Sequence, residues 1–170
     1  MTAIVTPEIA EQAWRRVGRL DHREVVKLQK RSGKFQPELV GFVLGFIDDL
    51  SPEGMGIALY AMLVIFEMFQ RAAPTGFTKV NERAILQLWQ ESRRIGDALL
   101  ASEFDSGLMS EFVIGSPEPT AIRYVVEALV DAQEESGNLP AEEVAQVLAI
   151  HRTVIHSLHA VARQHPLPSG

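Results

Sequence analysis

The segment Met55–Phe69 constrains the fold of this chain more than any other. It reads MGIALYAMLVIFEMF and is apolar on nearly every side when it is wound as a helix. A helix of that kind must be surrounded by other helices or by lipid. Its longest apolar run, Ile57–Phe66, is much shorter than the roughly 20 residues that cross a bilayer. We therefore expect the central helix of a packed core and no membrane partner.

Helix start and stop signals divide the rest of the chain. Thr6-Pro7-Glu8 and Ser51-Pro52-Glu53 each place a capping hydroxyl, a first-turn proline and an acid in order. Asp21 is expected to open a second helix that stops at Ser32-Gly33. Thr78 is expected to cap a long helix that runs to about Glu103.

Apolar residues recur at three- and four-residue spacings, which is the period of a helix. One such stripe is Val144, Val147, Val154 and Leu158. The pattern predicts an all-α fold, a single-domain antiparallel bundle of about six to seven helices over residues 1–165, with a short tail at 166–170. Gly41 and Gly45 are expected to let the central helix approach closely.

Positive charge is concentrated near the N-terminus. Between residues 13 and 34 only Asp21 and Glu24 oppose eight basic residues, so this stretch carries +6 and the remainder of the −6 chain carries −12. A helix-turn-helix fails here because the second helix would be apolar. The stretch is expected to bind either a protein partner or the acidic body of its own chain. Its basic residues are Arg15, Arg16, Arg19, Arg23, Lys27, Lys30, Arg31 and Lys34.

Three histidines fall in the last helix. His156 and His159 are three residues apart and are the candidates for a metal pair, but no third ligand is identifiable, so no metal site is predicted. His151 stands where the apolar stripe expects a hydrophobic residue. It is interpreted as a bonded core histidine, with a ligand contact or a pH-sensitive interface as the alternative.

Polar residues also interrupt the central segment. Glu67 is expected to pair with Arg71, four residues on, and the alternative is a polar group that faces a pocket together with Tyr60. Two carboxylate clusters lack the spacing of a calcium loop and are interpreted as a helix start and a solvated face. They are Asp48, Asp49 and Glu53, and Asp131, Glu134 and Glu135.

No catalytic or phosphate-binding motif is present in the sequence, and there is no cysteine. We therefore expect a non-catalytic, cytoplasmic protein without a cofactor that binds a protein partner or itself, a homodimer included. The main alternative is a small-molecule sensor or carrier with an apolar pocket beside the central helix. A metalloprotein using His156 and His159 and a nucleic-acid-associated factor are less favoured.

Overall fold

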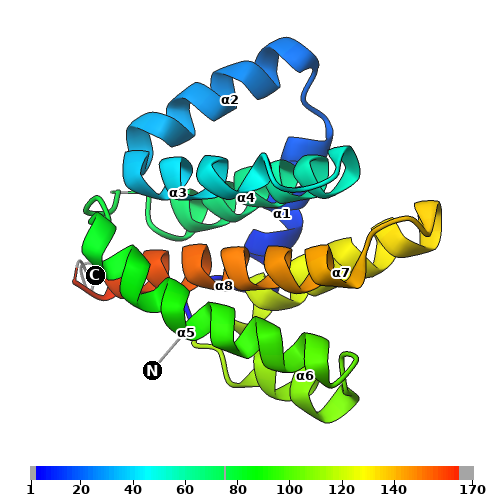
Figure 1. Ribbon diagram of the computed structural model, residues 1–170. Helices are drawn as coiled ribbons and strands as arrows, with labels where there is room; N and C mark the ends of the chain where they lie inside the picture. Colours follow the sequence, from blue (N-terminus) through cyan, green and yellow to red (C-terminus); the bar gives the residue numbers. More distant parts are fainter. Residues whose placement is uncertain (1–2, 75, 165–170) are drawn as a thin grey trace.

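Eight α-helices make up the described part of the chain, which is residues 3–74 and 76–164 of a computed structural model. No strand occurs within those two ranges. The all-α prediction is confirmed, and the expected count of six to seven helices is too low by at least one. Figure 1 shows the helices α1 (Pro7–Gly18), α2 (His22–Phe35), α3 (Pro37–Ile47), α4 (Pro52–Ala72), α5 (Glu82–Ala101), α6 (Ser106–Ile114), α7 (Pro119–Ser136) and α8 (Ala141–Gln164).

Local capping explains where several helices begin. Thr6 accepts a hydrogen bond from the backbone N–H of Ile9, and Ser51 accepts one from Gly54. Asp21 and Glu24 form the full reciprocal capping box. Each of these side chains satisfies a backbone donor that the first helical turn leaves without a partner. The three predicted start sites are confirmed.

Two predicted boundaries are wrong. α2 passes through Ser32-Gly33 and ends at Phe35, because Gly33 keeps a helical conformation and the chain is stopped by Pro37 instead. The hydroxyl of Ser32 donates to the Leu28 carbonyl inside this helix. Thr78 does not cap α5; Asn81 does, through its side-chain bond from Ala84 N–H.

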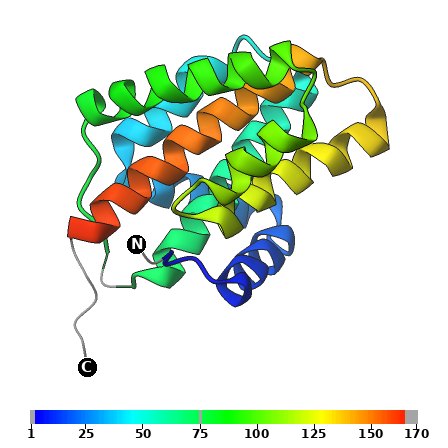
Figure 2. The same ribbon diagram turned by 90° about the horizontal axis from the view of Figure 1, so that it is seen from below.

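α4 is a core helix with neighbouring helices on several sides. Every residue from Ala61 to Phe69 is buried, and α4 packs against α1, α2, α3, α7 and α8. α8 is the second core helix and packs against α4, α5 and α7, as Figure 2 shows from below. By length and hydropathy alone α4 also passes the test for a membrane span, and most of that window lies buried against its neighbours.

The expected close approach at Gly41 and Gly45 is wrong. A Cβ built on either glycine would meet no atom within 4 Å, and both residues are exposed. The intimate contact is at Gly96 on α5, where a Cβ would lie 3.1 Å from the Ala145 carbonyl oxygen and 3.2 Å from Ala149 Cβ. Gly96 therefore permits the close packing of α5 on α8.

One hydrophobic core cluster draws buried residues from every helix. Val5, which precedes α1, also belongs to it. The expected tail at 166–170 lies outside the described residues.

Candidate functional site

Glu67 is a buried carboxylate held by three arginines. Its Oε1 lies 3.1 Å from the Nε of Arg71 and 3.1 Å from the Nε of Arg16, and its Oε2 lies 3.7 Å from Arg31. The predicted pairing with Arg71 is confirmed. Arg16 and Arg31 come from α1 and α2, so this carboxylate ties both helices to α4. We call these four residues the Glu67 clasp.

The basic stretch therefore divides into two sets. Arg16 and Arg31 belong to the Glu67 clasp, and Arg15 pairs with Glu11 one turn earlier at 2.6 Å. The other five residues are exposed and make no ion pair with any described residue. We call this second set the basic ridge: Arg19, Arg23, Lys27, Lys30 and Lys34.

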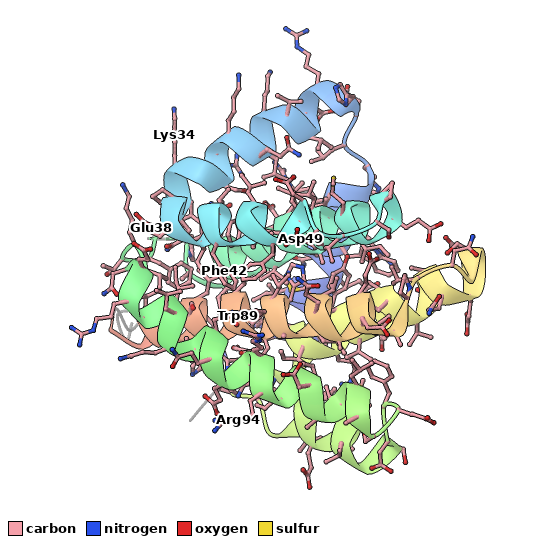
Figure 3. All side chains as sticks on the ribbon, viewed as in Figure 1. Lys34, Glu38, Phe42, Asp49, Trp89 and Arg94 are labelled. Atoms are coloured by element: carbon pink, nitrogen blue, oxygen red, sulfur yellow. The ribbon has the colours of Figure 1, made fainter. Side chains whose placement is uncertain are left out.

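Four members of the basic ridge lie along one side of α2. Arg23, Lys27, Lys30 and Lys34 follow the spacing of four, three and four that repeats on one helix face, and Arg19 precedes them at the end of α1. The α2 part spans about 16 Å at 1.5 Å per residue. α2 lies at the outer edge of the molecule, and Lys34 extends from it into solvent (Figure 3).

Tyr60 lines a pocket of about 320 Å³ between α1, α4 and α7, and Glu67 does not. The alternative that joined Tyr60 and Glu67 in one pocket is therefore wrong, because Glu67 belongs to the clasp. Trp14 and Tyr124 are the other aromatic residues of the pocket, with ring centroids 6.4 Å apart in an edge-to-face arrangement. The acidic residues that line it are Glu127, Asp131 and Glu135.

The two tyrosines of this pocket differ in exposure: Tyr60 is 37% exposed, whereas the hydroxyl of Tyr124 is buried. Burial raises the pKa of Tyr60, and the indole of Trp14 acts in the opposite direction. Burial and the neighbouring Tyr60 raise the pKa of Tyr124 further. The Tyr124 hydroxyl is buried and has no hydrogen-bond partner among the described residues. Both groups stay protonated at neutral pH.

His151 is fully buried in the core, and neither ring nitrogen has a well-aligned hydrogen-bond partner in the described ranges. Burial lowers its pKa to about 4, against a smaller opposite effect from the backbone of Ala58. The interpretation as a core histidine is confirmed, and its bond to the backbone is no more than a poorly aligned contact with Ala58. A neutral imidazole takes the place of an apolar side chain.

His156 and His159 face different partners. His156 Nε2 lies 2.9 Å from the hydroxyl oxygen of Ser116, and His159 Nδ1 lies 3.5 Å from Oε2 of Glu118. Within the residues that the structure describes, no three His, Cys, Asp or Glu side chains converge as metal ligands do.

The contact between Ser116 and His156 resembles a nucleophile and its base. Burial, Arg152 and His159 lower the pKa of His156 to about 3, which makes it a weak base at neutral pH. The Ser116 oxygen also accepts the backbone N–H of Glu118. We therefore interpret this pair as a structural bond at the start of α7.

Glu118 is a buried carboxylate that sequence inspection missed. Its Oε1 accepts the backbone N–H groups of Ile4, at 2.7 Å, and Val5, at 3.0 Å. Burial raises its pKa, and these two bonds lower it. The only local signal was the Ser116-Pro117-Glu118-Pro119 run, which carries no information about a partner 114 residues away.

No protein-family model, curated protein or solved structure matches this chain.

Proposed function

We propose that this chain is a non-catalytic interaction protein that binds an acidic protein surface along the basic ridge. One observation carries the proposal. The cations of the ridge have no anionic partner in the described part of the chain, whereas the other basic residues of the stretch are paired.

The arrangement of α2 has an energetic cost that an acidic partner would offset. Arg23 and Lys27 are four residues apart, as are Lys30 and Lys34, and Lys27 and Lys30 are three apart. Like charges at these spacings destabilise a helix by about 0.2–0.5 kcal/mol per pair. An anionic surface laid along this side would turn the repulsion into attraction.

A protein partner is favoured over nucleic acid. The chain as a whole is acidic, and the basic ridge contains no aromatic residue on which a base could stack. Phe35, the aromatic residue that follows the stretch, packs edge-on against Phe66 and contributes to the core instead. A second copy of this chain is also a candidate acidic partner, because its remainder carries −12.

The proposal includes a single-domain antiparallel bundle arranged around α4 and a cytoplasmic location. The continuous core with residues from all eight helices supports the single domain. The absence of cysteine is compatible with a reducing compartment. The low pKa of His156 argues against a general base at the Ser116–His156 pair.

Affinity capture with two charge-matched variants tests the proposal. The ridge variant is Arg23→Gln, Lys27→Gln, Lys30→Gln and Lys34→Gln. The control removes four other exposed cations without ion pairs to described residues: Lys79→Gln, Arg83→Gln, Arg94→Gln and Arg123→Gln. We expect the parent chain and the control variant to capture a protein partner that high salt releases and nuclease treatment does not. The ridge variant should capture none. Equal capture by all three, or retention that nuclease abolishes, would overturn the proposal.

A further inference from the structure

The pocket between α1, α4 and α7 combines aromatic walls with a row of carboxylates. We propose that it binds a linear aliphatic amine with two or more ammonium groups, that is, an α,ω-diamine or a polyamine. This site is separate from the basic ridge.

The charges that line the pocket favour a cationic ligand. Glu127, Asp131 and Glu135 line the pocket, and no basic residue does. None of the three carboxylates makes an ion pair with any residue that the structure describes. The pocket therefore carries three negative charges without an internal counter-charge, and a cation is the ligand that complements it.

The spacing of the carboxylates favours an elongated ligand with several charges. The three residues are four apart on α7, so each is displaced from the next by about 6 Å along the helix axis. Ammonium groups joined by three or four methylenes lie a similar distance apart, because each carbon–carbon bond of about 1.5 Å advances an extended chain by somewhat less than its length.

The aromatic walls favour an organic cation over a metal ion. Trp14, Tyr60 and Tyr124 present ring surfaces, with Ile57, Ala128 and Ala132 between them. Ammonium groups are attracted to aromatic faces, and methylene groups pack on apolar walls. A hydrated metal ion would gain neither contact. At about 320 Å³ the pocket is at the lower end of small-molecule sites and accommodates an extended alkyl chain.

The hydroxyl of Tyr124 is a further polar group at this pocket. Its hydroxyl is buried, it belongs to a residue that lines the pocket, and no described residue bonds to it. A hydroxyl oxygen accepts hydrogen bonds, and an ammonium group offers three donors and no acceptor. This oxygen has almost no accessible surface in the unliganded chain, so a bond from a ligand N–H requires the Tyr124 ring to turn its hydroxyl toward the pocket.

Gly56 allows the pocket to be filled without disturbing the core. A Cβ at this exposed position of α4 would meet nothing within 4 Å, and Gly56 lines the pocket. Gly56→Leu therefore places a side chain in the space of the ligand, and a helix tolerates leucine better than glycine.

The test is titration with 1,4-diaminobutane and spermidine, with butylamine as the single-charge comparison. Heat release is measured on the parent chain. The fluorescence of Trp14 is measured in a Trp89→Phe background, because Trp89 lies in a separate aromatic group with Phe42 and Phe46. A lysine-rich peptide distinguishes a free amine from the side chains of a protein partner.

We expect both polyamines to bind more tightly than butylamine and to change the Trp14 emission. Glu127→Gln and Asp131→Asn should each weaken binding about three- to fivefold, as for exposed ion pairs. Gly56→Leu should abolish it while the helical circular dichroism is kept. Glu134→Gln, on the same helix but outside this pocket, should change nothing. Equal binding of butylamine, unchanged affinity in Glu127→Gln, or saturation by the peptide alone would overturn the proposal.

Discussion

The Nε of Arg16 on α1 lies 3.1 Å from Oε1 of Glu67 on α4, so a single carboxylate joins the first helix to the buried segment of α4. Arg71 holds the same oxygen at the same distance, and Arg31 approaches the other oxygen from α2. The Glu67 clasp thereby fixes the two helices that carry the basic ridge.

Removing the carboxylate should release both helices. Glu67→Gln leaves three arginines around a neutral amide, and we expect the free energy of unfolding to fall by about 2 kcal/mol. This loss is smaller than for a fully buried ion pair because the three arginines are partly exposed. Urea unfolding measures this. Arg16→Gln should cost less than half as much because Arg71 still holds Oε1. Equal losses for the two variants would contradict a shared clasp.

His151 predicts how stability depends on pH. Its pKa is about 4 in the folded chain and about 6.5 in an unfolded one. The unfolded state therefore binds the proton first, and stability falls by up to about 1.4 kcal/mol per pH unit as the pH drops from 6.5 towards 4. His156, with a pKa of about 3, adds a second loss in the same direction.

His151→Leu isolates the first contribution. It replaces a buried ring without a well-aligned hydrogen bond by an apolar side chain, so we expect about 1 kcal/mol more stability at pH 7 and a flatter profile between pH 6.5 and 4. Urea titrations at four pH values measure both effects. His22→Gln, at an exposed position, serves as the control. A parallel profile for His151→Leu and the parent would show that this ring does not titrate with folding.

The glycines give opposite predictions on two helices. Gly41→Ala and Gly45→Ala meet open space, so each should raise the free energy of unfolding by about 0.5–1 kcal/mol. Gly96→Val must push against the Ala145 carbonyl and Ala149 and should cost about 2 kcal/mol. Thermal unfolding of the three variants measures these changes in stability. A stabilising Gly96→Val would contradict the close packing of α5 on α8.

Glu118 predicts local protection at the start of the chain. Glu118→Ala removes the acceptor of the Ile4 and Val5 N–H groups, so hydrogen exchange at these two amides should accelerate at least tenfold. The mutation should also destabilise the fold by about 2 kcal/mol, because buried donors lose their partner. Glu118→Gln keeps one acceptor oxygen and should have an intermediate effect. Unchanged exchange in Glu118→Ala would show that the bonds do not hold this segment.

Sequence patterns predicted what depends on near neighbours. The caps at Thr6, Asp21 and Ser51, and the ion pair of Glu67 with Arg71, each join residues three or four positions apart. The same patterns could not place Arg16 and Arg31 on Glu67, or Ser116 on His156, because those contacts depend on how whole helices pack. Gly41 and Gly45 were misjudged for the same reason: spacing does not reveal which helix face is covered.

For the candidate sites too, the sequence indicates local features and the structure is needed for contacts between helices. The basic stretch was evident as a charge imbalance, but its separation into paired and exposed cations required the positions of α1 and α2 relative to Glu67. The sequence predicts a pocket beside Glu67 and Tyr60, and only Tyr60 lines the one that the structure contains between α1, α4 and α7. Its other aromatic residues, Trp14 and Tyr124, come from helices more than 30 positions away in either direction.

The central claim is that the basic ridge binds an acidic protein, and a photo-crosslinking amino acid at position 27 tests it most directly. Lys27 lies in the middle of the basic ridge, and a probe at the exposed Arg94 on α5 serves as the matched control. Irradiation in living cells should yield one discrete protein adduct from position 27, mapped to an acidic segment of a partner or of a second copy of this chain, and none from position 94. No adduct, the same adduct from both positions, or an adduct to nucleic acid would contradict the claim.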